Sequence, residues 1–500
     1  MSKHKTLGQV YTPNWIVSEI LDSIGYNNEI ILDKYILEPS CGDGVFLTEI
    51  VKRYIKIASA NNLSTQQIAT NLEKYIYGIE LDEIEYKKST DNLDNLVIKE
   101  LSQNLKIKWN IFNQNTLEIY KSYSNFFDFV VGNPPYIRIH NLDLNTREVL
   151  KQDFMFSEGT IDIYLSFFEM GLKMLKSDGF LGYITPNSYL HNSSYKRFRE
   201  YLKNEKIVNT LIDFKSNKIF KGFSTYTAIT IINKKHSQNH FDYKEFIDDK
   251  IKLINKINFE YLDKNDWSFT DNDDDDFLLN LEKGKKSSIK DFFDVQYGFA
   301  TLRDKIFISI AKNHDENYVE FNGYLVERKI LRKVIKGSKF KGQVNENELI
   351  IFPYECEKNR YKAIPEERLA NQFPKAYEYL LANKEELVMR DLDKGASWYE
   401  FGRSQGIQTI HNEKIVLSTL VNGEINYYKV PEDVLMYSGI FIIKNKNYSD
   451  WSIIEETLKS EEFYKYIRIT GKDFSGGYKS ITSKQIKEFK VKENNPQSLF

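Results

Sequence analysis

The stretch LEPSCGDGVFL (37–47) is typical of a short buried strand, a tight turn with two glycines and the start of a helix. In a doubly wound α/β sheet such a turn lies at the carboxyl end of the first strand, where these folds bind ligands. Gly42 and Gly44 carry no Cβ, so the backbone can approach a ligand closely. The turn has neither a complete G-x-G-x-x-G nor a Lys-Ser/Thr pair, which disfavours a phosphate ligand. Its acidic residues favour a ligand with an ammonium or sulfonium group, and a turn without a ligand is the alternative.

Short β-branched or aromatic segments alternate with longer stretches of helical spacing through the first half of the chain. Apolar residues within 161–175, for example, recur three and four positions apart. The predicted strands are 35–40, 75–81, 106–112, 126–132, 179–186, 208–214 and 226–233. Strands that alternate with helices predict an α/β fold with a doubly wound, mostly parallel sheet that is covered on both faces.

The alternation stops near residue 240, and after about residue 285 the chain becomes irregular. A length of 500 residues suggests two or three domains at about 150 residues each. The expected organisation is a ligand-binding domain at 1–240, a linker at 241–284 and an irregular α+β domain at 285–500. We expect the acidic run DNDDDD (271–276) to be a solvated linker or loop tip, and 366–388 to be helical.

Composition limits the classes of partner. With 69 basic and 71 acidic residues the net charge is −2, so a polyanion would have to meet a local basic patch. The 33 Tyr and 33 Phe suit surfaces that stack on a ligand, but a coding bias towards AT-rich codons explains them equally well. Two cysteines cannot form a disulfide framework, and no His or Cys spacing resembles a zinc site. We find no signal peptide and no apolar run of membrane-spanning length, and therefore expect a cytoplasmic protein.

Polar side chains also follow the second and third predicted strands. Glu80 ends the strand YIYGIEL, and an acid at this place commonly accepts hydrogen bonds from both ribose hydroxyls. Leu81 can pack against an adenine face, and Asn115 can hydrogen-bond an adenine edge. Taken singly, such residues are usually ordinary surface residues. Their positions at the ends of consecutive strands predict a single site.

The stretch FVVGNPPYIRIH (129–140) ends the fourth strand with Asn133, two prolines and Tyr136. Proline fixes φ and has no N–H, so the carbonyl oxygens of this turn are held as acceptors on a stiff support. The Asn133 side-chain oxygen and the Pro134 carbonyl can each accept one hydrogen of a planar amine, while Tyr136 offers a flat ring. An amine held in this way can attack an electrophilic methyl group, a displacement that depends mainly on positioning. A Pro-Pro turn without a ligand is the alternative.

Seven motifs in order resemble those of the gamma-class N6-adenine DNA methyltransferases of the Taq type. They are GQVYTP (8–13), LEPSCGDG (37–44), GIELD (78–82), NPPY (133–136), DIYLSFFEMGLKML (162–175), GYITPNSYL (182–190) and IFKGFSTYTAITI (219–231). The resemblance implies a class I methyltransferase fold, S-adenosyl-L-methionine as methyl donor, S-adenosyl-L-homocysteine as product and no metal. An adenine within a duplex cannot reach such a pocket, so it must be flipped out. The resemblance also implies that Phe220 forms the far side of the base pocket, opposite Tyr136.

The candidate site residues follow from these motifs. The candidate catalytic residues are Asn133, Pro134, Tyr136 and Phe220. The candidate cofactor-binding residues are Thr12, Pro13, Glu38, Ser40, Gly42, Asp43, Glu80, Leu81 and Asn115. Many members of the family carry Asp where this chain has Asn115, but the oxygen of the amide can still accept a hydrogen bond.

The second half resembles the family's DNA target-recognition domain less sharply. Its landmarks are 291–307, 397–405, 414–443 and 474–491. The stretch 324–342 has one acid among seven Lys or Arg and is a candidate phosphate track, although a solvated basic surface is the alternative. The candidate DNA-binding residues in it are Lys329, Arg332, Lys333, Lys336, Lys339 and Lys341. We interpret Trp398, Tyr399 and Arg403 as core and hinge residues in preference to base readers.

Other functions share some of these motifs. NPPY also occurs in enzymes that methylate a glutamine of release factors and in some ribosomal RNA methyltransferases, but those usually end soon after the last strand. A non-catalytic DNA-specificity subunit would need neither NPPY nor LEPSCGDG. A fused nuclease is disfavoured because GQVYTP opens the chain. We expect a stand-alone site-specific adenine methyltransferase (EC 2.1.1.72) that acts on double-stranded DNA. A separate restriction enzyme for the same site is the expected partner, and an orphan regulatory enzyme is the alternative.

Overall fold

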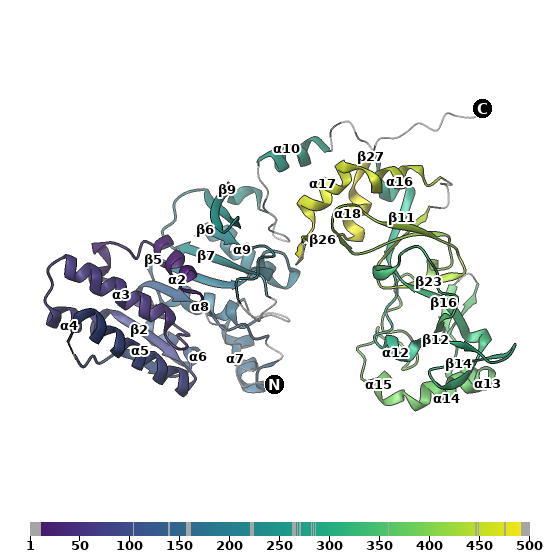
Figure 1. The fold of residues 1–500 in the computed structure, drawn as a ribbon, viewed down its shortest axis with the longest axis horizontal. Helices are drawn as coiled ribbons and strands as arrows, with labels where there is room; N and C mark the ends of the chain where they lie inside the picture. Colours follow the sequence, from purple (N-terminus) through teal and green to yellow (C-terminus); the bar gives the residue numbers. More distant parts are fainter. Residues whose placement is uncertain are drawn as a thin grey trace. The chain divides into compact units, whose positions relative to one another are not determined.

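The structure, a computed structural model, divides into two compact units, Met1–Asn272 and Asp273–Phe500. The described residues are 12–103, 105–138, 141–156, 162–220, 225–262, 267, 269, 272–281, 283, 285, 287–358, 360–445, 448, 450–474 and 477–491. Parts of the motifs GQVYTP (8–13) and IFKGFSTYTAITI (219–231) therefore lie outside them. Figure 1 labels the helices and strands of both units.

In the first unit, strands and helices alternate as the sequence predicts. The strands are β1 (Ile36–Glu38), β2 (Ile76–Glu80), β3 (Asn110–Asn113), β4 (Phe127–Gly132), β5 (Leu175–Pro186), β6 (Val208–Asp213), β7 (Thr227–Asn233), β8 (His240–Ile247) and β9 (Lys250–Asn258). The helices are α2 (Asn14–Ser23), α3 (Val45–Ala60), α4 (Thr65–Tyr75), α5 (Glu83–Leu101), α6 (Thr116–Ile119), α7 (Leu144–Asp153), α8 (Tyr164–Met174) and α9 (Lys196–Glu205). All seven predicted strands are present.

Among the described residues these strands form one sheet in the order β3-β2-β1-β4-β5-β7-β6-β8-β9. The strands β1 to β5 run parallel to one another, whereas β7 lies antiparallel between β5 and β6. Beyond β6, β8 is parallel and β9 antiparallel to its neighbour. The sheet is therefore mixed. Its parallel part, β1 to β5, contains the strands that precede the predicted ligand-binding turns.

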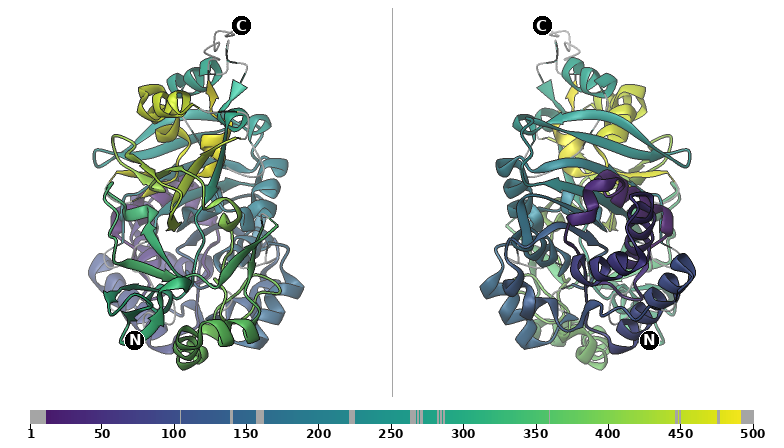
Figure 2. Two further views of the ribbon diagram at one scale, coloured as in Figure 1. Left: turned by 90° about the vertical axis from the view of Figure 1, so that its right-hand side faces the viewer. Right: turned by 90° about the vertical axis from the view of Figure 1, so that its left-hand side faces the viewer.

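Helices cover both faces of this sheet, and in the right-hand view of Figure 2 the purple and blue helices lie on opposite sides of it. Alternating strand residues supply the two cores because successive side chains point to opposite faces. Ile36 and Val131 pack with α2, α3, α4 and α5, whereas Leu37 and Val130 pack with α8 and α9.

The first unit extends further than the sequence suggested. The predicted linker at 241–284 is wrong in its first part, because β8 and β9 continue the sheet to Asn258. Strand β8 alternates half-buried and buried residues in its first half, and it pairs in parallel with β6. The boundary between the units falls at Asn272 and Asp273. DNDDDD is not a loop tip either, since its described residues 272–276 begin helix α10.

The second unit is an α+β assembly of small sheets, as predicted. Its helices are α10 (Asn272–Leu281), α11 (Ile289–Phe292), α12 (Asp304–Phe307), α13 (Glu366–Gln372), α14 (Pro374–Ala382), α15 (Lys384–Val388), α16 (Ser452–Lys459), α17 (Glu461–Thr470) and α18 (Ser483–Glu488). Its first strands are β10 (Ser287–Ser288), β11 (Phe293–Tyr297), β12 (Ile308–Ile310), β13 (Lys312–Asn313), β14 (Tyr318–Phe321), β15 (Tyr324–Glu327), β16 (Leu331–Lys336), β17 (Glu348–Ile351), β18 (Tyr354–Glu357) and β19 (Arg360–Ala363). The remaining strands are β20 (Lys414–Leu417), β21 (Leu420–Val421), β22 (Tyr427–Val430), β23 (Val434–Tyr437), β24 (Ile440–Lys444), β25 (Asp473–Phe474), β26 (Tyr478–Ser480) and β27 (Lys490–Val491).

The two largest of these sheets have the orders β11-β24-β20-β22 and β12-β17-β16-β23. The predicted helix at 366–388 is broken into α13, α14 and α15. The first break lies at Phe373 (φ −133°, ψ 59°), because the residue before a proline is disfavoured in the helical region. Pro374 then starts α14.

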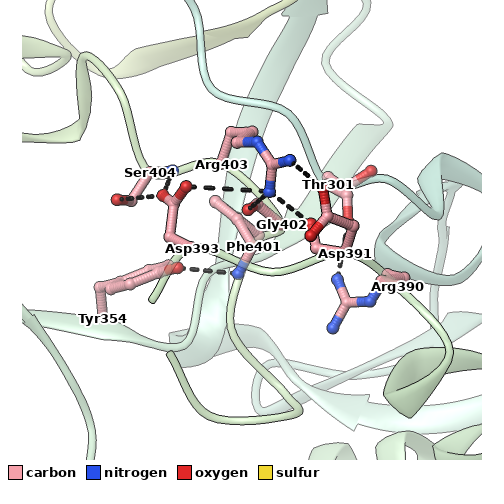
Figure 3. Close-up of polar contacts among 9 residues, drawn as sticks. All are labelled: Thr301, Tyr354, Arg390, Asp391, Asp393, Phe401, Gly402, Arg403 and Ser404. Atoms are coloured by element: carbon pink, nitrogen blue, oxygen red, sulfur yellow. Dashed lines mark hydrogen bonds and ion pairs between the residues drawn. The ribbon is translucent and has the colours of Figure 1, made fainter. Parts of the chain in front are cut away.

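The buried side chain of Arg390 donates hydrogen bonds to segments of the second unit that are distant in sequence (Figure 3). The Arg390 guanidinium donates to the carbonyl oxygens of Leu387, Thr301 and Trp398 at 2.9, 2.6 and 2.5 Å. Burial lowers the pKa of Arg390 to about 10, so it still carries its charge near neutral pH. These bonds join the segment after β11 to the segment after α15.

The stretch SWYEFGRSQ (397–405) belongs to the same network. Tyr399 is buried and donates to the Ile364 carbonyl at 2.8 Å, so it is a core residue, as the sequence suggested. Arg403 forms an ion pair with Asp391 at 2.6 Å, and Asp393 accepts from the Ser404 N–H at 2.8 Å (Figure 3). None of the described helices is both long and apolar enough to cross a membrane.

Candidate functional site

A cavity of about 510 Å³ lies in the first unit, at the carboxyl ends of β1, β2, β3 and β4. This volume is in the usual range for a small-molecule site, about 300–1,000 Å³. The sequence-predicted residues that line it are Thr12, Glu38, Ser40, Gly42, Asp43, Glu80, Leu81, Asn115, Asn133 and Pro134. Of the candidates, Pro13, Tyr136 and Phe220 are not among the described residues of its wall. Tertiary structure thus gathers most of the predicted site around one cavity.

The turn after β1 forms one wall. Glu38 is buried, and its Oε2 has no hydrogen-bond partner among the residues that the structure describes. Gly42 has a φ of +52°, and a Cβ there would meet nothing within 4 Å, so the space beside it is open. Gly44 has a φ of +85°, and a Cβ there would lie 2.6 Å from Ser89 Oγ. Both glycines are needed for the turn, as side chains rarely adopt this backbone conformation.

The Glu80 carboxylate at the end of β2 is oriented by the backbone. Its Oε2 accepts from the Gly42 N–H at 2.7 Å, and its Oε1 accepts from the Asp82 N–H at 2.8 Å. A carboxylate oxygen has further lone pairs, so each can accept a second hydrogen bond from a ligand. Glu80 therefore joins the turn after β1 to β2.

The cavity is acidic. The carboxylates that line it are Glu38, Asp43, Glu80, Asp82, Glu85 and Asp143, and no Lys, Arg or His is among its described lining residues. Burial raises the pKa of Glu38 well above its usual range, and the nearby charges of Glu80 and Asp43 raise it further. Burial also raises the pKa of Glu80 and Asp43. A cation in this cavity would relieve the cost of these buried negative charges.

The third strand end holds Asn115 in a structural contact. Its Oδ1 accepts from the Leu117 N–H at 3.1 Å and so caps α6, while its Nδ2 donates to Glu118 at 3.3 Å. The expected contact of this oxygen with an adenine edge would therefore use its second lone pair. Leu81 is exposed by 63%, as suits a residue that packs against a flat ligand.

The turn after β4 closes the other end of the cavity. Gly132 has a φ of +152°, which redirects the chain into Asn133 and Pro134. The Asn133 side-chain Nδ2 donates to Thr12 Oγ1 at 3.1 Å, and the Ser40 hydroxyl lies 3.5 Å from the Asn133 carbonyl oxygen. The same turn thus contacts both the segment before α2 and the turn after β1.

Tyr136 and Phe220, predicted to form opposite sides of a base pocket, lie next to each other in the structure, where their rings meet edge to face. Their ring centroids are 6.4 Å apart, and the ring planes are 75° from each other. A flat group that stacks between two aromatic rings contacts both by their faces, and these two ring planes are far from parallel.

Sequence reasoning missed several residues of the cavity wall. They are Pro39, Cys41, Val45, Phe46, Asp82, Glu85, Thr116, Leu117, Pro135, Ile137, Asn141, Leu142, Asp143, Thr146, Ile163 and Phe167. Thr116 donates to the Pro39 carbonyl at 2.5 Å, a contact between two distant segments that a local sequence pattern cannot predict. Ile163 and Phe167 belong to the motif 162–175, whose periodicity predicted the helix but not which face reaches the site.

Three basic residues of the candidate phosphate track in the second unit already interact with other groups of that unit. Lys333 lies 2.8 Å from Glu346, and Lys336 lies 3.6 Å from Asp304. Arg332 donates to the carbonyl oxygens of Lys329 and Leu331 at 2.8 Å. The other three candidates, Lys329, Lys339 and Lys341, are exposed. The DNA contacts of this stretch remain a prediction, and the exposed lysines are now its best candidates.

Comparison with known proteins finds relatives of the segment that contains most of this cavity and the Asn-Pro-Pro-Tyr turn. Residues 45–220 match the family described as Eco57I restriction-modification methylase. This segment is thus similar to the methylase domain of that family, and the chain is similar in sequence to type II methyltransferases.

Individual relatives extend the similarity into the second unit. The type II restriction enzyme and methyltransferase RM.Eco57I of Escherichia coli is 25% identical, over 94% of this chain and 55% of its own length. The type II methyltransferase M.BstVI of Geobacillus stearothermophilus is 28% identical, over 46% of this chain and 42% of its own length. M.BanIII of Aneurinibacillus aneurinilyticus is 23% identical, over 73% of this chain and 67% of its own length. This chain thus spans about half the length of the first two relatives.

A solved structure shares the fold. The type IIL restriction-modification enzyme MmeI, solved in complex with DNA, aligns with a TM-score of 0.60 at 13% identity. The alignment covers 95% of this chain and 65% of that one. Within the described part of the chain, no group of three His, Cys, Asp or Glu side chains is arranged to hold a metal ion.

Proposed function

We propose that this chain is a site-specific DNA adenine methyltransferase, which transfers a methyl group from S-adenosyl-L-methionine to N6 of a flipped-out adenine. The observation that carries the proposal is a single cavity lined by the carboxylates Glu38 and Glu80 and by Asn133 and Pro134. Carboxylates suit a cationic donor, and the carbonyl oxygens suit an amine that accepts the methyl group. The homology to type II methyltransferases supports the same reaction.

The cavity fits the proposed donor. Glu38 Oε2, which has no hydrogen-bond partner within the described ranges, and the acidic lining suit the ammonium and sulfonium charges of S-adenosylmethionine. The Glu80 carboxylate, fixed by two backbone N–H groups, would accept from the two ribose hydroxyls. Leu81 would cover the adenine ring. When bound, S-adenosylmethionine supplies an electrophilic methyl group on sulfur.

The chain's own residues would prepare the acceptor. The lone pair of an adenine N6 is delocalised into its ring, which makes the amine a poor nucleophile. Asn133 Oδ1 and the Pro134 carbonyl would each accept one N6 hydrogen, which favours a pyramidal nitrogen with its lone pair directed at the methyl group. The two prolines keep these acceptors in place, so catalysis is mainly positioning.

The base would stack on Tyr136 after Phe220 turns from its edge-to-face contact. Stacking contributes about 1–3 kcal/mol per base, which would offset much of the few kcal/mol needed to flip a base out of a duplex. Contacts of the second unit with phosphates and groove edges would supply the rest. The exposed Lys329, Lys339 and Lys341 are the candidates for phosphate contacts.

We further propose double-stranded DNA as the partner, in keeping with the MmeI enzyme, whose structure was solved in complex with DNA. A restriction endonuclease with the same target is the expected second partner. The name of the E. coli relative joins restriction and methyl transfer.

The decisive experiment incubates the chain with methyl-labelled S-adenosylmethionine and genomic DNA, followed by modified-base analysis and methylation-aware sequencing. The expected product is N6-methyladenine at one sequence motif. Label in N4-methylcytosine, in RNA or only in protein would refute the proposal.

A matched variant tests the turn itself. Asn133→Ala should bind the cofactor as tightly as the wild type but lose transfer, because only the acceptor amine depends on the carboxamide. Near-normal turnover by this variant would remove the proposed role of Asn133.

A further inference from the structure

We propose that Thr12 is a positioning residue for the Asn133 carboxamide, so that its hydroxyl acts through Asn133 on the acceptor amine. This inference rests on the proposed function and deepens it. The observation is the hydrogen bond from Asn133 Nδ2 to Thr12 Oγ1, at 3.1 Å between residues 121 positions apart. Thr12 is only 6% exposed, so little water competes for this bond.

Thr12 is held by the helix that follows it. Pro13 caps α2, and the N–H groups of Ile16 and Val17 donate to the Pro13 carbonyl at 3.0 and 3.3 Å. Ile16, Val17, Ile20 and Leu21 of this helix are fully buried against the sheet. Thr12 is therefore at the end of a rigid element and not on a free loop.

A glycine sets how closely α2 approaches the sheet. A Cβ on Gly182 in β5 would lie 2.7 Å from Ile20 Cγ2 and 3.1 Å from Ile24 Cγ2. A side chain at this position would therefore require α2 or its isoleucine side chains to shift. The neighbouring strand β4 carries Asn133 just past its end, so two adjacent strands fix the two partners of the bond.

The place of the carboxamide decides whether it can hold an amine. The torsion that turns the amide group of an Asn side chain is soft, so the group needs a partner that restrains it. In the structure Nδ2 donates to Thr12 Oγ1, which leaves Oδ1 on the opposite end of the amide group. A threonine hydroxyl can donate as well as accept, so the bond restrains where the amide group lies without selecting which end faces the hydroxyl.

The test compares Thr12→Val with Thr12→Ser in the full chain. Valine keeps the shape of threonine and removes the hydroxyl, whereas serine keeps it. With DNA and S-adenosylmethionine saturating, Thr12→Val should lower kcat by about 10- to 100-fold, since small misplacements of reacting groups have effects of this size. Its Kd for S-adenosylmethionine, measured by calorimetry, separates this role from the cofactor contact that the sequence predicted for Thr12: as a positioning residue it should leave the Kd within about twofold of the wild type. Thr12→Ser should recover most of the turnover.

A second background separates positioning from general damage. In Asn133→Ala the side chain ends at Cβ and offers no partner to the Thr12 hydroxyl. Thr12→Val should therefore add little further loss to the residual single-turnover rate of Asn133→Ala. An equal loss in both backgrounds would overturn the inference, as would a weaker Kd for the cofactor with kcat unchanged, which would make Thr12 a cofactor contact. A wild-type chain that methylates no adenine would instead refute the proposed function.

Discussion

Glu38→Gln should change stability and cofactor affinity in opposite directions. In the wild type the buried Glu38 carboxyl must either bear a charge without contact to water or hold a proton. Its Oε2 has no hydrogen-bond partner among the described residues. The amide removes this ionisation and keeps the size of the side chain. It also removes a negative charge that a cationic ligand would meet.

The sign of the stability change follows from the pKa. Burial raises the pKa of folded Glu38 above its ordinary value of 4.5, so the folded state holds this proton more tightly than the unfolded state. Wild-type stability therefore falls as pH rises from about 4.5 through the folded pKa, and the variant avoids this loss. A buried charge costs more than a buried amide, by about 1–2 kcal/mol. At pH 9, an approximate choice well above the unfolded pKa, the first unit should therefore melt about 2–4 °C higher for each kcal/mol gained.

Cofactor affinity should move the other way. A hydrogen bond or ion pair with a charged group contributes about 1.5–3 kcal/mol, so Glu38→Gln should weaken the Kd for S-adenosylmethionine by about 10- to 100-fold. Differential scanning fluorimetry from acid to alkaline pH and titration calorimetry measure the two effects. The matched control is Glu83→Gln, an exposed residue ion-paired with Lys87 at 2.6 Å, which should change neither. A lower melting temperature at alkaline pH, or an unchanged Kd, would refute the reasoning.

Four further substitutions test other parts of the structure. Glu80→Gln should weaken cofactor binding by about 10-fold or more, because an NH₂ group would oppose one of two backbone N–H donors; calorimetry with an unchanged Kd would contradict this. Gly44→Ala should destabilise the first unit by about 1–3 kcal/mol, since its Cβ would lie 2.6 Å from Ser89 Oγ at a φ of +85°; an unchanged urea midpoint would disprove the crowding. Phe220→Leu should raise the KM for DNA by about 10-fold through lost stacking while leaving the cofactor Kd unchanged, and equal effects on both ligands would argue against a base contact. Arg390→Met should lower the free energy of unfolding of the second unit by at least about 3 kcal/mol, because three carbonyl oxygens lose their donor. Calorimetry measures this as a lower transition temperature of the second unit, and a shift of the first unit's transition instead would contradict the prediction.

Much of the first unit could be predicted from the sequence because its signals are local. Strand length, β-branched composition and glycine turns act within a few residues, and parallel strands bring their carboxyl ends to one edge. That is why Glu38, Glu80 and Asn133, far apart in the chain, could be assigned to one site and do line one cavity. The parallel order of β1 to β5 follows from the same alternation.

Contacts between distant segments could not be predicted in this way. Periodicity did not indicate that β8 and β9 extend the sheet, because the pairing of β8 with β6 is set by packing and not by neighbours in sequence. Nor did charge density show that Lys333 and Lys336 form ion pairs with acids of their own unit. The edge-to-face contact of Phe220 with Tyr136 likewise depends on side-chain packing.

The sequence by itself determined the class of fold, the order of the motifs and the residue types of the site, because each depends on short-range backbone preferences. Only the tertiary structure decided which of those residues touch. The clearest case is the hydrogen bond between Thr12 and Asn133, whose partners are anchored by α2 and β4. Its geometry depends on how closely a helix packs on a sheet, and that distance is a property of the whole core.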